Sequence, residues 1–318
     1  MDASIATAPL PPEPRARSRR TTVLGRALDR VHPWAIAIAL AIVAFLVYYG
    51  SVTVRWDFYD HFTWQAQAFL DGSPFIRWPV TEGPFTNDYF QDVMPIDGRP
   101  GEGLLPFPPL PAILLLPFVA IWGLATSAST VAAALGALNV ALCWRMLLRV
   151  TDRRDAAFLG TIFYGFGTVA WYAAMLGSTW FYAHVAASTF LFLGIAAALE
   201  GDRRERMGRT ARRIGGIVVP RGVWAGLLAG TAMLARLTTG FGAPFFVFVG
   251  AGGTWWRRAL SAGIGFAIPL VLLVGYTWTT TGHLFNPAYE YLYRNEYRPV
   301  GAFRSEEHTS ELQSLRHL

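Results

Sequence analysis

The stretch WAIAIALAIVAFLVYYGSVTV, residues 34–54, decides the fold class of this chain. It contains no charged residue, and its length is close to the ~20 apolar residues that a membrane-spanning helix needs. The 318-residue chain is 53% hydrophobic and only 15% charged, which is typical of a membrane protein rather than a soluble domain. Seven further apolar runs follow, at 108–125, 128–148, 156–176, 179–199, 222–237, 239–254 and 259–279. The sequence therefore predicts an all-α polytopic membrane protein.

All the positive charge behind the net +6 comes from arginine, because the chain contains no lysine. The arginines cluster beside apolar runs, where the positive-inside rule explains them better than nucleic-acid binding does. If all eight runs crossed the membrane, the clusters at 145–154 and 203–213 would both lie outside. Removing one crossing before residue 145 places both clusters inside. We therefore interpret 104–125, whose start is rich in proline, as an interfacial or re-entrant segment, and we expect seven spans with the N-terminus in the cytoplasm.

Two flanking segments are set apart from this transmembrane domain, which we assign to residues 34–303. Residues 1–33 are rich in proline and arginine and are predicted to form a disordered cytoplasmic tail. The string RSEEHTSELQS at 304–314 matches the in-frame translation of a common sequencing adapter. We interpret 304–318 as an assembly artefact and expect the native C-terminal region to be missing. The lack of lysine beside abundant alanine, glycine and arginine is typical of a GC-rich, bacterial genome.

The segment at 55–107, directly after the first apolar run, is rich in aspartate. Carboxylates are costly in hydrocarbon, so this segment is predicted to be a long external loop. Its six aspartates are Asp57, Asp60, Asp71, Asp88, Asp92 and Asp97. A functional site that needs carboxylates is most readily built here.

Several motifs in and around this loop resemble those of a known enzyme family. They are DFYDHFTWQAQAFLDG (57–72), QDVMPIDGR (91–99), LPFPPLPA (105–112), LGSTWFYAH (176–184) and LARLT (234–238). In order and spacing they resemble the bacterial GT-C glycosyltransferases of the family 39 type, which are related to protein mannosyltransferases and lipid A aminoarabinose transferases. The chain departs from that pattern after Arg99, where it has Pro-Gly-Glu-Gly in place of an aromatic residue and tyrosine.

The resemblance implies a GT-C-like helical bundle with a long first external loop that carries short interfacial helices. It also implies transfer of a sugar from a polyprenyl-phosphate donor to an acceptor at the external face of the cell membrane. Such a reaction needs a general base at the acceptor hydroxyl and positive charge at the phosphate leaving group. The sequence identifies neither the sugar nor the acceptor.

The candidate site residues follow from this chemistry. Asp57 is the preferred base, with Asp92 and Asp60 as further catalytic candidates; Asp60 also suits a helix N-cap, and Asp92 a solvated loop position. Arg236 and Arg99 are candidates for the phosphate, although snorkelling to headgroups is an alternative for Arg236. His61 and His184 are candidate substrate ligands, with packing and a helix–helix hydrogen bond as their alternatives. No metal-ligand spacing is present outside the adapter-like tail, and a divalent cation between Asp57 and Asp92 is left open.

Two other functions remain as alternatives. A multi-span transporter or lipid flippase should carry ionisable or helix-breaking residues at mid-span, whereas the charges here concentrate in one loop and at span ends. An inactive truncated fragment is the third possibility, because the C-terminal region is expected to be missing.

Overall fold

Four helices are long and apolar enough to cross a membrane in the computed structural model, which describes residues 22–52, 60–77, 92–96, 99–208, 211–214 and 217–285. A bent pair of helices forms a fifth crossing if both halves are taken as one span; the bend between them is 49°. The four are α2 (Pro33–Gly50), α5 (Ala128–Val150), α8 (Thr179–Arg206) and α11 (Trp255–Thr281), and the pair is α6 (Arg154–Phe166) with α7 (Val169–Leu176). The prediction of an all-α, multi-pass membrane protein is confirmed at this level.

Local sequence signals set the ends of these helices. Pro33 occupies the first turn of α2, where its missing N–H costs nothing. The Ser127 hydroxyl caps α5 by accepting the Thr130 N–H. Gly167 ends α6, and Thr168 restarts the helix as α7 by accepting the Ala170 N–H. Gly177, with φ +58°, then turns the chain sharply against Ser129 at the start of α5.

Two of the seven predicted spans, 222–237 and 239–254, are not full-length α-helices. They form α9 (Arg221–Met233), the 3-10 helix η3 (Leu237–Gly242) and the single turn α10 (Phe245–Phe248). Glycine and proline are frequent from Gly240 to Gly253 and interrupt regular α-helix there.

The α9–α10 segment nevertheless makes a hairpin along α8. Arg221 and Ala251 both adjoin Gly201 near one end of α8, whereas Arg236 contacts His184 towards the other end. His184 and Gly201 are about 25 Å apart along the axis of α8, because an α-helix rises about 1.5 Å per residue.

Close packing of α9 on α11 depends on glycines spaced four apart. Gly222, Gly226 and Gly230 lie along one side of α9 and adjoin Ser261, Ala262 and Phe266 of α11. Gly265 of α11 adjoins the Val223 carbonyl in return. A Cβ at Gly226 would overlap the Ala262 backbone carbonyl, which has no rotamer by which to move. This is the small-residue packing that lets membrane helices approach closely.

We expect Gly226→Ala to destabilise the protein by about 1–3 kcal/mol, because the added methyl group forces α9 and α11 apart. Gly263→Ala on α11 is the matched control, since no described atom lies within 4 Å of its Cβ position and alanine favours helix by up to about 1 kcal/mol. Thermal unfolding in detergent compares the two. Equal melting temperatures for both variants would contradict a close glycine interface.

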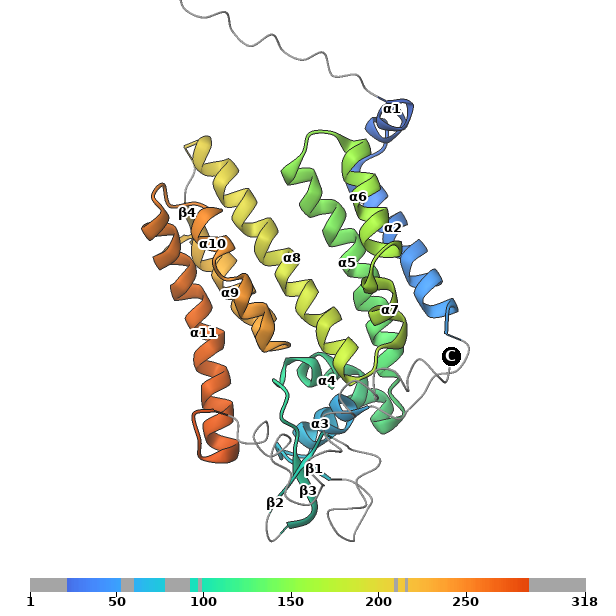
Figure 1. Ribbon diagram of the computed structural model, residues 1–318, viewed down its shortest axis with the longest axis vertical. Coiled ribbons are helices and arrows are strands. Elements are labelled where there is room, and N and C mark those ends of the chain that lie inside the picture. The colour runs from blue at the N-terminus through green and yellow to red at the C-terminus, as the bar shows by residue number, and fades with distance from the viewer. Residues whose placement is uncertain are drawn as a thin grey trace, which may run out of the picture.

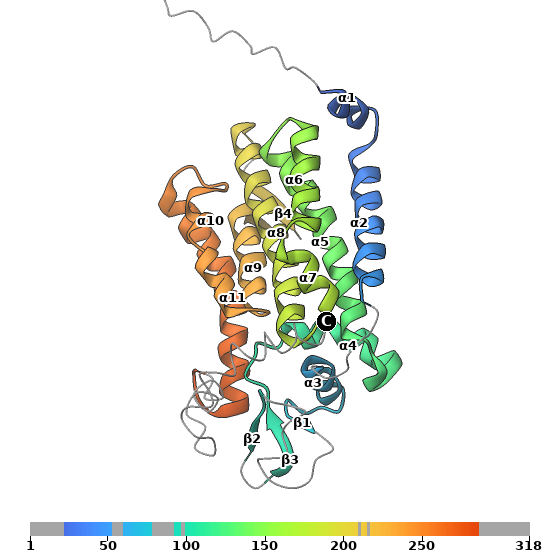
Figure 2. The ribbon, with the colours of Figure 1, turned by 45° about the vertical axis from the view of Figure 1, so that its right-hand side comes forward.

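Helix ends that carry arginine gather at one end of the bundle, the upper end in Figures 1 and 2, beside α1 (Val23–Asp29). Here Arg154 Nη1 donates to the carbonyls of Leu28 and Val31 at 2.8 and 3.0 Å. The Trp144 indole donates to the Pro33 carbonyl at 3.0 Å, and Arg149 lies 3.7 Å from Glu200. The hairpin of β4 (Ala211–Ile214) and β5 (Ile217–Pro220) connects α8 to α9 at the same end. One end is therefore strongly basic, which the positive-inside rule associates with the cytoplasm.

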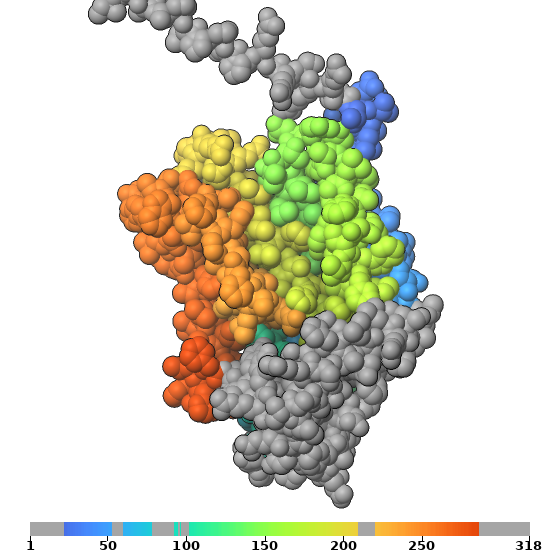
Figure 3. Space-filling view, viewed as in Figure 1, coloured from blue at the N-terminus to red at the C-terminus, as the bar shows by residue number. Residues whose placement is uncertain are grey.

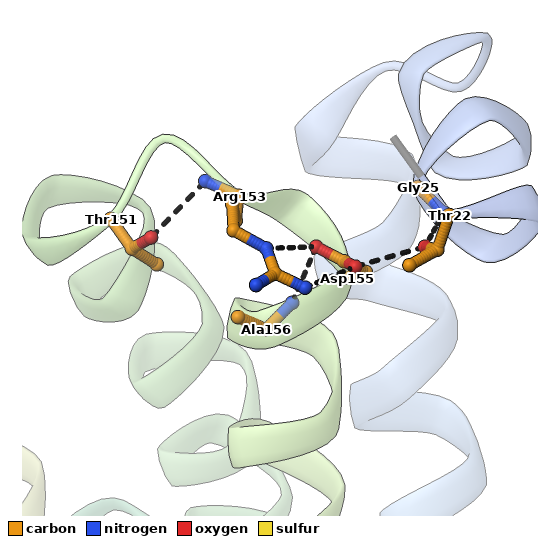
Figure 4. A network of polar contacts seen from close by, with 6 residues as sticks. All are labelled: Thr22, Gly25, Thr151, Arg153, Asp155 and Ala156. Carbon is orange, nitrogen blue, oxygen red and sulfur yellow. Dashed lines mark hydrogen bonds and ion pairs between the residues drawn. The ribbon is translucent and has the colours of Figure 1, made fainter. Parts of the chain in front are cut away.

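The N-terminal segment is partly ordered, so the prediction of disorder is wrong for residues 22–33; residues 1–21 lie outside the described part. Figure 4 shows the contact that docks α1 onto α6. The Asp155 carboxylate, almost fully buried, accepts hydrogen bonds from the Thr22 hydroxyl at 2.9 Å and from Arg153 Nη2 at 2.8 Å. Thr22 also caps α1 by accepting the Gly25 N–H at 2.9 Å. The cap and the buried carboxylate order this segment despite the proline- and arginine-rich composition that suggested disorder.

Asp155→Ala should loosen α1 from the bundle, because it removes the hydrogen bond from the Thr22 hydroxyl to the buried carboxylate, worth about 1.5–3 kcal/mol. Trypsin cleavage at Arg26 and Arg30 in nanodiscs measures the release. The exposed Asp152→Ala serves as the control. Cleavage rates that match between the two variants would argue against the Asp155 contact.

The opposite end carries small elements that cover the bundle. Helix α3 (His61–Leu70) lies there with the strands β1 (Ile76–Arg77), β2 (Met94–Ile96) and β3 (Arg99–Leu104), in the antiparallel order β1-β3-β2. Helix α4 (Leu110–Trp122) and η2 (Gly123–Ala125) then lead into α5. Their shared core is formed by Phe62, Ile76, Leu105, Leu115 and Tyr182 among others. The predicted non-crossing segment 104–125 therefore contains a 13-residue helix, about 20 Å long and too short to span; its interfacial position stays a prediction.

Candidate functional site

Helix α3 is fixed to the first turn of α8 by a buried pair. The Thr179 hydroxyl accepts the His61 backbone N–H at 3.3 Å and lies 2.7 Å from His61 Nδ1. Both side chains are almost completely buried, and Trp180 packs against the imidazole at a centroid distance of 6.3 Å. This burial favours the packing role of His61 over the predicted role as a substrate ligand.

A second polar contact joins α3 to α11. Gln65, which is fully buried, donates through Nε2 to the Tyr276 hydroxyl at 3.1 Å. Phe69, one turn further along α3, meets the edge of the same Tyr276 ring. Helix α3 therefore bridges α8 and α11, two helices that are far apart in the sequence.

Burial lowers the pKa of His61 to about 3, from an ordinary value of 6.5. The charged imidazolium is disfavoured because the ring is removed from water. His61 is therefore neutral at physiological pH, in keeping with its short contact to the Thr179 hydroxyl.

We predict that docking of α3 weakens on acidification. The unfolded chain binds a proton at His61 below pH 6.5, whereas the folded site does so only near pH 3. The contribution of neutral His61 to stability is therefore fully present above pH 6.5 and is lost as the pH falls from 6.5 towards 3. The loss is about 1.4 kcal/mol per pH unit in that window. Hydrogen exchange of the α3 amides at pH 7 and pH 5 measures it. The variant His61→Gln should lose this component of the pH dependence, and an unchanged profile would exclude His61 as its source.

Two of the predicted site residues meet near the same end of the bundle. Arg236, which follows α9 and precedes η3, directs its guanidinium at His184 on α8. The distances from His184 Nε2 are 2.6 Å to Nη2 and 3.2 Å to Nε of Arg236. Because Nε2 accepts these N–H groups, the imidazole is neutral and does not neutralise the arginine charge. The backbone two residues before Arg236 is held by α4, because the Leu110 N–H donates to the Leu234 carbonyl at 3.1 Å.

A hollow of about 350 Å³ adjoins this pair. It lies between α5, the α6–α7 break and α8, and Figure 3 shows α8 recessed between the α6–α7 and α9–α10 segments. Polar side chains line it in an otherwise apolar bundle: Asn139, Tyr164, Thr168, His184 and Ser188. The hollow is a candidate ligand site by its volume and polar lining, although hydrogen bonds within the protein already engage Asn139, Thr168, Ser188 and His184.

The remaining predicted residues are placed as follows. Asp57 lies outside the described residues. Asp60 occupies the N-cap position of α3 and is half-buried, but its side chain makes no capping hydrogen bond. Asp92 is half-buried and directly precedes the buried Val93 and strand β2. Arg99 begins β3, and its side chain is outside the described part.

Within the described residues, no group of three His, Cys, Asp or Glu side chains is arranged to hold a metal ion. The cation left open between Asp57 and Asp92 involves a position beyond those residues. Arg236 and His184 are thus the groups that the described structure offers to a phosphate.

Some residues that shape the site were missed by the sequence analysis. Asn139 donates to the Val185 carbonyl at 2.8 Å and accepts the Thr189 hydroxyl at 2.7 Å, which joins α5 to α8 beside the hollow. A lone asparagine within an apolar run was a usable signal for such a contact. Thr179 and Gln65 carried no comparable signal, because their partners are more than 100 residues away.

The described residues thus define a polar site at the end of an apolar bundle opposite the arginine-rich end, beneath α3. Comparisons with known proteins add no relative: no protein-family model, no curated protein and no solved structure matches this chain.

Proposed function

We propose that this protein is a membrane glycosyltransferase of the GT-C type, which moves a sugar from a polyprenyl-phosphate donor to an acceptor at the external face of the cell membrane. The observation that carries the proposal is the Arg236–His184 pair, held beside a polar hollow at the end opposite the basic one. A guanidinium presents fixed N–H groups in the geometry that a phosphate oxygen requires.

The orientation is supported by the arginine distribution. The positive-inside rule makes the basic end cytoplasmic, with the N-terminus on that side. Arg236, His184, α3 and the aspartate-rich loop then face the exterior. A lipid-linked phosphate in the external leaflet lies at the depth of Arg236, and carboxylates of the loop approach it from the water.

In this mechanism the phosphate leaves as a stable anion, so it needs positive charge rather than a proton. Arg236 supplies that charge, and the neutral His184 fixes the guanidinium through its Nε2. Asp57 accepts the proton of the acceptor hydroxyl, with Asp92 as the alternative base. Asp60 and Arg99 are further candidates at the same end.

Two variants test these roles. Asp57→Asn should slow transfer by about 10²–10⁴ with donor affinity preserved, because it removes a general base. Arg236→Ala should weaken donor binding roughly 10- to 100-fold, which corresponds to the loss of one or two charge-assisted hydrogen bonds. Both are measured by release of polyprenyl phosphate from a radiolabelled donor in membranes and by donor binding in nanodiscs.

Arg257→Ala, at the basic end, is the matched control and should leave both quantities unchanged. If Asp92→Asn lost turnover while Asp57→Asn kept near-normal turnover, Asp92 rather than Asp57 would be assigned as the base. Normal turnover in all the aspartate variants, with unchanged donor binding in Arg236→Ala, would reject the glycosyltransferase.

A transporter or lipid flippase is the second candidate, and one observation favours it. The α6–α7 break of 49° borders the polar hollow, and broken helices beside polar groups at membrane depth are typical of transport sites. Movement of a lipid-linked sugar between the two leaflets of the proteoliposome membrane, without release of polyprenyl phosphate, would support this alternative.

A further inference from the structure

A second hollow, of about 210 Å³, lies at the external end and is separate from the Arg236–His184 site. It is bounded by the C-terminal half of α3, the turn into β1 and Leu124 of η2; Figure 2 shows α3 and β1 side by side below the bundle. Two aromatic and four polar side chains line it: Trp64, Phe75, Gln67, Asp71, Ser73 and Arg77.

The walls of this hollow are fixed by backbone contacts and core packing. Trp64, Gln67 and Asp71 share one face of α3 through their spacing of three and four residues. Gly72, with φ +76°, reverses the chain, and the Ser73 N–H then donates to the Ala68 carbonyl at 2.8 Å. Ile76, which follows Phe75, is fully buried and pairs with Gly103 of β3. A site with walls fixed in this way loses little entropy when it binds a ligand.

The charges around the hollow disfavour an anion. Arg77 Nε donates to Glu102 at 2.8 Å, so this cation is already engaged in an ion pair. Asp71 adds a carboxylate, which accepts from Gln67 Nε2 at 3.1 Å. Two carboxylates against one guanidinium would repel a phosphate or carboxylate ligand.

The remaining chemistry suits a neutral ring that carries hydroxyl groups. A pyranose presents an apolar C–H face to an aromatic ring and equatorial hydroxyls that both donate and accept hydrogen bonds. Trp64 and Phe75 supply aromatic surface, while Asp71, Gln67 and Ser73 supply acceptors and donors. The volume lies below the 300–1,000 Å³ typical of drug-sized ligands, which limits the occupant to about one sugar ring.

We propose that this hollow binds one neutral hexopyranose unit of a glycan. Trp64 lies one helical turn after Asp60, so the bound sugar would be about 5 Å further along α3 from that candidate carboxylate. The assignment of this sugar to the acceptor, which makes the acceptor a glycan, rests on the proposed glycosyl transfer. The binding site itself does not depend on it.

Ligand-observed NMR on the full chain in nanodiscs tests the proposal, with methyl glucopyranoside, methyl mannopyranoside and methyl galactopyranoside as probes and glucose 6-phosphate as the anionic comparison. At least one methyl glycoside should bind saturably and more tightly than glucose 6-phosphate. Trp64→Leu and Asp71→Asn should each weaken it roughly tenfold or more, since buried aromatic contacts dominate such sites. Trp278→Leu, an exposed tryptophan on α11, is the matched control and should bind normally.

Saturable binding that is lost in Trp64→Leu and Asp71→Asn but kept in Trp278→Leu would establish the site. Absence of saturable binding by all three glycosides, or equal affinity in Trp64→Leu and Trp278→Leu, would overturn it. Donor turnover is scored separately. Glycoside binding without any release of polyprenyl phosphate would support the sugar site and reject the glycosyltransferase. Release of polyprenyl phosphate without glycoside binding would support the glycosyltransferase and reject the sugar site.

Discussion

The docking of α3 on the first turn of α8 is the contact on which the end of the protein opposite the arginine-rich one depends. One threonine hydroxyl serves both the backbone and the ring of His61, and all of these atoms are removed from water. A buried pair of this kind tolerates little displacement, because an unsatisfied polar atom would cost free energy that the surrounding apolar contacts do not return. The strands, α4 and the hollow lined by Trp64 and Asp71 take their positions from this helix or from the core that it shares.

The bundle beneath α3 is organised by two opposite demands. Many arginines gather at one end with their carboxylate and carbonyl partners, and there the N-terminal helix is also tied to the start of α6. Between the ends, alanine and glycine are frequent at the helix contacts, and the glycines bring α9 close to α11. Arg236 lies away from the basic end and contacts a neutral histidine, whereas Arg77, at the same end as α3, is ion-paired with Glu102. In the proposed function the Arg236 guanidinium meets the donor phosphate.

The sequence predicted the class of fold well because hydrophobicity and arginine position are local properties. Runs such as 34–54 and 128–148 became α2 and α5 with small shifts of their ends. The span count was less predictable: 239–254 has span-like hydrophobicity but also the glycines that replace α-helix by a 3-10 turn and coil. Disorder was predicted as far as residue 33, and the order of residues 22–33 was missed. It depends on the Thr22–Asp155 contact, which joins positions 133 apart in the chain. For the site, the sequence analysis named Arg236 and His184 separately and did not predict their contact. That contact, the hollows and the Gln65–Tyr276 hydrogen bond depend on tertiary packing that no local pattern encodes.

The short α9 hairpin gives this molecule one thin side. Helix α9 has 13 residues, about 20 Å, against a hydrocarbon thickness of about 30 Å. Lipids along that flank must compress or tilt to match it, whereas those beside the 27-residue α11 need not. If the bilayer thins to match α9, headgroups approach the Arg236 guanidinium more closely than they would in an undeformed bilayer. In this way the length of one helix sets the depth at which the protein meets the polar surface of the membrane.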